Sequence, residues 1–429
     1  MRRFLLHAFG IILCLPFSFL TLNAQITLDY CQTKAREHYP LVANYGLIEK
    51  TKEYNLENAN KSYLPQLSLS AKATIQSDVT NLPIKLPFIE IPQLNKDQYQ
   101  ATLEVSQIIW DGGMIKSNKD ILKASSEVEK NNLELNLYGL KDRISELYFG
   151  ILLIKEQIKQ AKIMDSELNR NLDKVKTYIE NGVANLSDES LIKVEILNNK
   201  QKITEAETRL RTYCKILSTF IGQEINQETQ LEAPSYLLVD NEQEKIGVYF
   251  SNRPELKLFD SQYSVLESNK KIIDSKNLPK IGAFAQGGYG RPGLNMLTNE
   301  FSFFAIAGLR LNWNFGNLYT MKNENKIISN NQTNILNQKE TFVFNTNMML
   351  EQQKADIQRL KQLLITDNEI ISLRESIKKS TEYKVENGTK NINDLMQDIS
   401  YEDMAKQTKI LREIQLLMSI YRYNTIINE

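Results

Sequence analysis

The longest uninterrupted pattern lies between Gly113 and Gly182, where 68 residues contain no proline and only two glycines. Apolar residues recur there at alternating steps of three and four, and the series misses one position at Asp165. The series comprises Leu137, Leu140, Ile144, Leu147, Ile151, Ile154, Ile158, Ala161, Leu168, Leu172, Val175 and Ile179. Such spacing is typical of a coiled-coil seam. Because a continuous helix of roughly 70 residues is ~105 Å long, the pattern predicts a rod rather than a compact globule.

Four shorter stretches alternate apolar and polar residues with the period of two that is typical of strands. They cover about residues 66–75, 99–110, 280–289 and 301–313. Phe304 and Ile306 fall on the otherwise polar side of the last stretch, so its alternation is less regular. Strands of about ten residues are long enough to cross a bilayer when they are tilted. The alternative is a small soluble sheet at one end of the coiled coil.

The same landmarks occur twice in the same order, which indicates an internal duplication. Pro40 and Pro65 recur 214 residues later as Pro254 and Pro279. The two tryptophans begin related motifs, and each of two Glu-Asn-Gly turns is followed by an aspartate six residues after its glycine. The tryptophan motifs are Trp110-Asp111-Gly112-Gly113 and Trp313-Asn314-Phe315-Gly316. The turns are marked by Gly182 with Asp188 and by Gly388 with Asp394.

We therefore expect a mainly α protein with a transmembrane β portion, built from two repeats of a helix–strand–strand–long helix–helix unit. The first repeat covers residues 25–234 with a hairpin tip near 182–188. The second covers residues 235–429 with a hairpin tip near 388–394. The strand stretches then fall in pairs, two in each repeat.

The shorter helices of a repeat together match its long helix in length. Residues 28–62, interrupted near Pro40, and residues 187–221 are 35 residues each, or ~52 Å apiece as helices. Each repeat thus provides one long helix and one interrupted helix of the same length. Two repeats provide four such rows of helix side by side, which we call lanes. A four-stranded sheet in lipid leaves its edge amides unpaired at several kcal/mol each, so it must close with further copies. Eight strands leave a lumen filled by side chains, whereas twelve or more leave room for water and solute.

The first 24 residues have the form of a secretory signal peptide. Arg2 and Arg3 supply the basic start, an apolar run follows, and residues 22–24 end in a small residue. The alternative is a retained membrane anchor, and lipid attachment at Cys14 is disfavoured because Leu13 precedes it. No later apolar run reaches the ~18 residues of a membrane-spanning helix. Lysine plus arginine equals aspartate plus glutamate at 52 each, so nothing suggests a nucleic-acid partner.

The chain after the signal offers little chemistry for catalysis. Its one histidine, His38, can form neither a metal cluster nor a catalytic triad. No phosphate-binding loop or nucleophile elbow is present in the sequence. Cys31 and Cys214 would lie in a compartment that permits disulfides, where they could pair or remain as two buried apolar thiols, the reading we favour. We expect no enzyme, no cofactor and no metal.

The ordered, duplicated motifs resemble those of the TolC family of outer-membrane efflux channels. The resemblance covers residues 25–429 and includes Trp110-Asp111-Gly112-Gly113 before the long helix and Arg253-Pro254-Glu255-Leu256 at the start of the second repeat. It implies a homotrimer in outer-membrane lipid, with a 12-stranded β-barrel continued by an α-helical barrel in the periplasm. It also implies a passive conduit of a tripartite efflux or type I secretion system. A periplasmic adaptor would couple that conduit to an inner-membrane pump.

The same resemblance implies roles for the hairpin tips, whose turns are at Gly182 and Gly388. Asp394 matches the first carboxylate of an acidic ring that narrows the periplasmic aperture, whereas the second falls on Gln397, a departure from the family. Lys390 and Asp188 match two partners of a polar link that keeps the aperture shut. The alternative is that Asp188 and Asp394 begin their helices as capping residues.

A structural or adhesive coiled-coil envelope protein without a pore is the competing class. It accounts for the seam but not for the duplicated strand pairs. A periplasmic adaptor would need β-rich domains flanking a single hairpin, and the sequence lacks them. The cargo stays open between drugs, metals and proteins, because a passive conduit takes its specificity largely from its pump.

Overall fold

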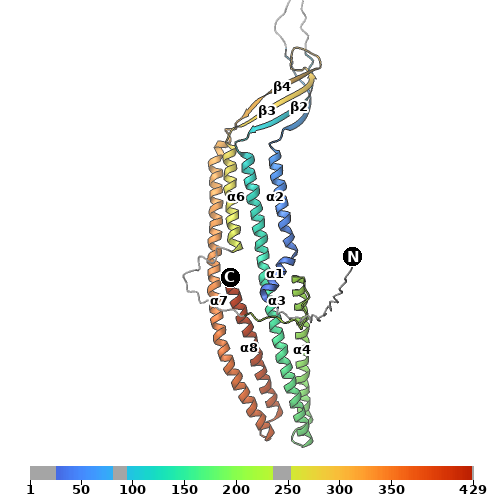
Figure 1. The fold of residues 1–429 in the computed structure, drawn as a ribbon, viewed down its shortest axis with the longest axis vertical. Coiled ribbons are helices and arrows are strands. Elements are labelled where there is room, and N and C mark those ends of the chain that lie inside the picture. Colours follow the sequence, from blue (N-terminus) through green and yellow to red (C-terminus); the bar gives the residue numbers. More distant parts are fainter. Residues whose placement is uncertain (1–25, 81–93, 235–252, 428–429) are drawn as a thin grey trace, which may run out of the picture.

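The computed structural model describes residues 26–80, 94–234 and 253–427. The predicted signal peptide lies outside the described residues. The chain is strongly elongated, with a β-sheet at one end and two helical hairpins at the other (Figure 1). The predicted order of helix, two strands, long helix and helix occurs twice, so the expected mainly α fold class is confirmed.

The elements of the two repeats follow one another in the same order, although α1 has no counterpart among the described residues of the second repeat. The first repeat contains α1 (Leu28–His38), the short 3₁₀ turn η1 (Pro40–Ala43), α2 (Asn44–Lys61), β1 (Gln66–Ile75), β2 (Asp97–Trp110), α3 (Met114–Glu180) and α4 (Leu186–Ile221). The second contains α6 (Pro254–Lys276), β3 (Lys280–Arg291), β4 (Ser302–Asn312), α7 (Asn317–Glu386) and α8 (Ile392–Ile427). Pro40 explains the break between α1 and α2, because proline has no N–H group to continue the helix.

The helices form four lanes that lie side by side (Figure 1). Helix α2 and helix α4 share one outer lane, α3 forms the next, α6 and α8 share the third, and α7 forms the other outer lane. In the upper half α3 contacts α2 and α6, and in the lower half it contacts α4 and α8. Helix α7 packs on α6 above and on α8 below. The lane order is therefore the same along the whole helical part.

The four strands form one antiparallel sheet in the order β1-β2-β3-β4. Its register sorts the side chains into two faces. One apolar row consists of Leu69, Leu103, Gly287 and Ala305. In the single chain this face is bare, since Leu69 is 77% exposed and Phe303 is 85% exposed. We call it the apolar face and the opposite side the polar face. Among the described residues, no helix is long and apolar enough to cross a membrane.

The predicted seam of α3 packs in the core of the helical part. Nine of its twelve positions are buried and three are partly buried. Met164 fills the position that the series misses at Asp165. The pattern did not predict the largest buried side chains, the adjacent Tyr148 and Phe149. They are buried because α1 and the extended segment around Leu231 cover α3 at this level, and the Tyr148 hydroxyl lies 2.6 Å from the Ile26 carbonyl oxygen.

The two cysteines are buried and unpaired, so the reading that favoured two apolar thiols is confirmed. Burial raises the pKa of the Cys31 thiol to about 12, well above that of an ordinary thiol. The reactive thiolate at neutral pH should therefore be much scarcer than in an unfolded chain. We expect N-ethylmaleimide to leave Cys31 and Cys214 unmodified in the folded protein and to modify both in denaturant, as measured by mass spectrometry. Fast modification without denaturant would contradict the buried position.

Candidate functional site

Both hairpin tips end their long helix in the same way. Gly182 and Gly388 have φ angles of +73° and +71°, a left-handed conformation that glycine adopts without strain. The backbone N–H of Val183 donates to the Tyr178 carbonyl at 2.8 Å, and Thr389 donates to Lys384 at 2.8 Å. These six-to-one bonds are Schellman motifs, which satisfy carbonyl groups at a helix end.

Both tips also begin the returning helix in the same way. The Asp188 carboxylate accepts from the Asn185 backbone N–H at 3.0 Å, and the Asn185 side chain accepts from the Asp188 N–H at 3.2 Å. Asn391 and Asp394 make the same reciprocal pair at 3.4 and 2.8 Å. Such capping boxes satisfy N–H groups at a helix start. The six-residue step from glycine to aspartate therefore contains the end of one helix and the start of the next.

The remaining predicted tip residues make few contacts within one chain. Lys390 is exposed, and among the described contacts none joins it to Asp188. A link between them stays a prediction for contacts between copies. Gln397, where the resemblance places a second carboxylate, donates to the Tyr401 hydroxyl at 2.9 Å. The Arg374 guanidinium lies 4.6 Å from the centre of the Tyr401 ring, so the tyrosine that binds Gln397 also has a cationic neighbour.

The junction between β2 and α3 explains its Trp-Asp-Gly-Gly motif. Asp111 is buried, and its carboxylate accepts from the N–H groups of Gly113 at 2.8 Å and Ile115 at 2.6 Å. It therefore caps the start of the long helix. Gly112 has a φ of +69°, and a Cβ there would come within 2.7 Å of the Leu278 side chain. Only glycine fits this turn without moving Leu278, which follows the end of α6.

The second junction performs the same task with different groups. Asn314 replaces the aspartate, and its side-chain oxygen accepts from the Gly316 N–H at 2.9 Å. The Trp313 indole N–H donates to the Asn277 carbonyl at 3.0 Å, which ties the end of β4 to the end of α6. Trp110 and Trp313 remain 42% and 45% exposed, so both rings face outward at the same end of the sheet.

Three residues of α3, seven positions apart, attach the second hairpin to the first. We call Gln160, Glu167 and Lys174 the α3 ladder. Their partners on α8 and α7 are Asp403 at 3.0 Å, Lys378 at 2.7 Å and Glu382 at 2.6 Å, respectively. Because positions seven apart face the same side of a helix in a coiled coil, the ladder fixes the register of the two hairpins near their tips.

A buried carboxylate, Glu402, lies beside the middle rung of the ladder. Its oxygens are 2.7 Å from Lys378 Nζ and 2.5 Å from Lys406 Nζ. Burial alone would raise the pKa of Glu402, but the hydrogen bonds and charges of the two ammonium groups outweigh burial and lower it. The stability that this shift contributes is present above the pKa of an unfolded glutamate and is lost as the pH falls through the lowered value.

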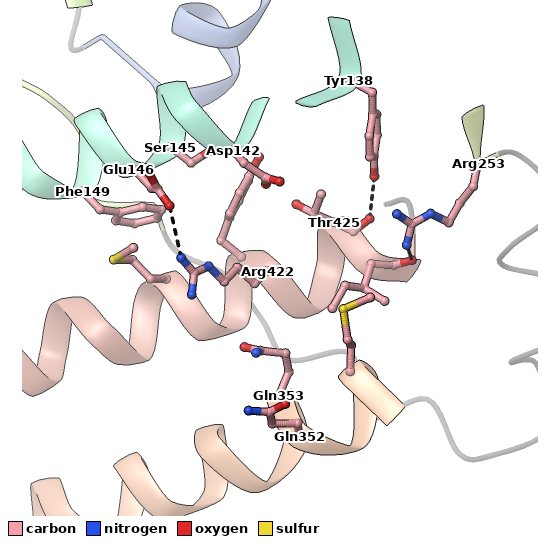
Figure 2. A pocket seen from close by; sticks show the side chains of 14 residues that line it. Tyr138, Asp142, Ser145, Glu146, Phe149, Arg253, Gln352, Gln353, Arg422 and Thr425 are labelled. Atoms are coloured by element: carbon pink, nitrogen blue, oxygen red, sulfur yellow. Dashed lines mark hydrogen bonds and ion pairs between the residues drawn. The ribbon is translucent and has the colours of Figure 1, made fainter. Parts of the chain in front are cut away.

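A pocket of about 380 Å³ lies where α3, α7 and α8 meet the start of α6 (Figure 2). The buried Arg253 donates to the Ile426 carbonyl at 3.1 Å and pairs with Glu255 at 2.8 Å. Tyr138 donates to the Thr425 carbonyl at 2.8 Å (Figure 2). These donors satisfy the last turn of α8, so Arg253-Pro254-Glu255-Leu256 joins the two repeats. No group of three or more His, Cys, Asp or Glu within the described ranges is arranged to hold a metal.

Residues 33–223 match the family profile described as outer membrane efflux protein. The matched segment contains both strands of the first repeat, the capped junction at Asp111 and the hairpin with its tip at Gly182. Over these residues the chain matches the outer membrane efflux protein family. This match agrees with the predicted outer-membrane location with a helical extension into the periplasm.

Solved structures of other proteins share the fold of this chain over nearly its full length. VceC of Vibrio cholerae is 12% identical with a TM-score of 0.67, and the alignment covers 93% of this chain and 95% of VceC. The outer-membrane channel OprN is 12% identical with a TM-score of 0.68, covering 93% and 89%. The open state of MtrE of Neisseria gonorrhoeae is 12% identical with a TM-score of 0.64, covering 93% and 88%. The curated proteins gave no match.

The contacts that sequence reasoning missed all join residues that are distant in the chain. The α3 ladder reaches partners more than 200 residues away. Its signal was available, because polar residues at a constant spacing of seven along a coiled coil mark one face. The spacing does not reveal which face of the rod packs against a second hairpin. That face is known only once the order of the helical lanes is known.

Proposed function

We propose that three copies of this chain form a channel that conducts solutes passively from the periplasm to the exterior. The observation that carries the proposal is that the chain has the same two edges at every level. One edge consists of β1, α2 and α4, and the other consists of β4 and α7 (Figure 1). Two different edges that recur along the whole length suit head-to-tail association, which closes into a ring when the rotation permits it.

The outer lanes carry apolar side chains that are bare in the single chain. On α4, Val194 is 51% exposed and Leu197 is 60% exposed. On α7, Ile365 and Leu373 are each 64% exposed. Above them, the exposed apolar residues of the outer lanes include Leu47 and Tyr54 on α2 and Ile327, Leu336 and Phe344 on α7. Ring closure would cover both sets.

The sheet supports three copies rather than two. Two copies would give eight strands and a lumen filled by side chains, whereas three give twelve and leave a channel. Aromatic residues mark both ends of the strands, as they do at the two interfaces of a membrane. Those at the helical end are Trp110, Trp313 and Phe315, and those at the far end are Tyr99, Tyr289, Phe301 and Phe303.

In the finer proposal, a periplasmic adaptor joins the hairpin tips to an inner-membrane pump in an efflux or secretion system. The family match over residues 33–223 and the exposed hairpin tips support it. The test purifies the full chain in detergent and reconstitutes it in planar bilayers. Trimers that dissociate on heating and produce conductance steps support the channel. A water-soluble monomer without conductance would favour the coiled-coil scaffold.

We also propose that Asp394 contributes to a ring of carboxylates at the periplasmic aperture. Three carboxylates around a narrow pore attract cations, so Asp394→Ala is expected to lower the cation preference measured as the reversal potential across a KCl gradient. Because Asp394 also caps α8, the matched control is Asn391→Ala, which removes the side-chain cap and keeps the charge. An unchanged reversal potential in Asp394→Ala, or an equal change in the control, would remove Asp394 from the pore.

A further inference from the structure

The polar face of the sheet, which would line the proposed channel, divides into two halves. On β1 and β2 it carries Ser68, Ser70, Thr102 and Glu104, and Ser70 and Thr102 join through their hydroxyls at 2.7 Å. On β3 and β4 the same rows continue differently. The row of Ser70 and Thr102 reaches Gly288 and Phe304, and the row of Ser68 and Glu104 reaches Gln286 and Ile306.

Two phenylalanines on this half lie over glycines of the neighbouring strand. Phe304 pairs with Gly288, and Phe284 pairs with Gly308. A Cβ on Gly288 would come within 2.2 Å of the Phe304 ring, and one on Gly308 within 3.3 Å of the Phe284 ring. Both rings therefore lie low over the sheet, as aromatic residues do when they cover a cross-strand glycine.

A guanidinium group lies beside these rings. The Arg310 carbon Cζ is 4.6 Å from the centre of the Phe284 ring, and Arg310 is 3.3 Å from the Glu104 carboxylate. The Arg310 side chain nevertheless remains 57% exposed. On the polar face of the described strands, Lys72, Lys280 and Arg310 are positive and only Glu104 is negative. The net charge of this face is therefore +2 per chain.

Strand packing alone does not require this arrangement. An aromatic ring can also cover a glycine on the apolar face of a sheet, where the ring would meet lipid. On the polar face each ring keeps apolar surface in water, at roughly 25 cal/mol per Å². A stacked, exposed guanidinium next to such a ring is instead suited to a ligand with an apolar body and a negative group.

We propose that Phe284, Phe304, Ile306 and Arg310 form a binding site in the channel wall for amphipathic organic anions. The flat apolar part of the ligand packs on the two rings and Ile306, and its anionic group faces the guanidinium. The excess positive charge of the face raises the local concentration of such anions. This inference rests on the proposed channel, since only a closed ring gives the polar face a lumen.

The test uses 1-anilinonaphthalene-8-sulfonate, an aromatic sulfonate, as a blocker of the reconstituted full-length trimer. We expect concentration-dependent block of the conductance. Phe304→Ser and Arg310→Gln should each weaken the block by about tenfold. Phe304→Leu, which keeps an apolar cover over Gly288, should weaken it less. The matched control is Phe303→Ser, the adjacent residue on the apolar face, which should leave the block unchanged.

The outcomes separate this site from the channel itself. Three results would each contradict the binding site without contradicting the channel. They are normal conductance without block, equal weakening of the block by Phe303→Ser, and equal block by an aromatic cation. Absence of conductance in the unaltered protein would refute the channel and the site together. Heat-sensitive trimers on gels show that each variant has assembled before its block is measured.

Discussion

Leu373→Glu is expected to weaken the trimer strongly while leaving each chain folded. Leu373 is 64% exposed in the single chain, so a charged side chain there meets only water before assembly. In the proposed ring, α7 of one copy meets α4 of the next. Each interface then loses the ~1.5–3 kcal/mol of a buried leucine and must desolvate a carboxylate. Three interfaces bring the loss to about 5–9 kcal/mol per trimer. The measurement is the temperature at which trimers dissociate on gels.

The matched control is Ile163→Glu. Ile163 is also exposed, at 50%, but it lies on α3, which has a neighbouring lane on both sides within one chain. Ring closure does not require this side chain, so the trimer should keep its dissociation temperature. If both variants behave alike, α7 is not an edge of the ring.

A second-site change sharpens this test. Leu197 lies eleven residues after the start of α4, and Leu373 lies thirteen residues before the end of α7, so both stand at a similar height above the tips. In the head-to-tail ring, Leu197→Lys should recover part of the stability lost in Leu373→Glu, because opposite charges then face each other. Recovery would identify α4 of the neighbouring copy as the partner of α7.

The parts of the fold that the sequence predicted well depend on short-range periodicity. The 3.5-residue pattern from Leu137 to Ile179 reports one helix face, and each alternating stretch reports one strand. Such signals are local, so a single sequence contains them whole. The duplicated motifs added the connection between the two halves. The burial of Tyr148 and Phe149 was not predicted, because it comes from α1 and the segment near Leu231, which cover α3 outside its seam.

The tips show where local chemistry was predicted in outline only. The sequence offered two readings of Asp188 and Asp394, as capping residues or as charges with a role in the aperture. The structure places both carboxylates in capping boxes. Capping occupies only some of the hydrogen-bond acceptor positions of a carboxylate, because each oxygen can accept more than one hydrogen bond. The capping geometry therefore does not remove the charge from the aperture, and the role in the ring depends on contacts between copies.

The ion pairs that fix the second hairpin were beyond prediction for a different reason. A charged residue on a long helix usually faces water, and a sequence does not reveal the few that do not. Asp367 is such a case. Its side chain is only 5% exposed in the lower half of α7, and its partner is Arg412 on α8. Nothing in the spacing of either residue distinguishes this pair from the exposed pairs that surround it.

Arg412→Met is expected to lower the free energy of unfolding by about 3–5 kcal/mol, the cost of leaving a buried charge without its partner. The cost arises from Asp367, one of whose oxygens already lacks a hydrogen-bond partner in the structure. The measurement is thermal unfolding of the purified trimer followed by far-UV circular dichroism. Because the pair joins α7 to α8, the lower part of the second hairpin should unfold first.

Two further variants determine whether the effect comes from the stranded carboxylate. Arg359→Met removes an exposed guanidinium from the same helix as Asp367, where it pairs with Asp356 at 3.0 Å, and should cost at most ~0.5 kcal/mol. Adding Asp367→Leu to Arg412→Met removes the buried charge and should recover most of the lost stability, since apolar residues of similar volume replace buried ion pairs without loss. If the double variant is as unstable as Arg412→Met alone, the cost lies in lost packing by the arginine stem. In that case the pair does not hold the hairpin through its charges.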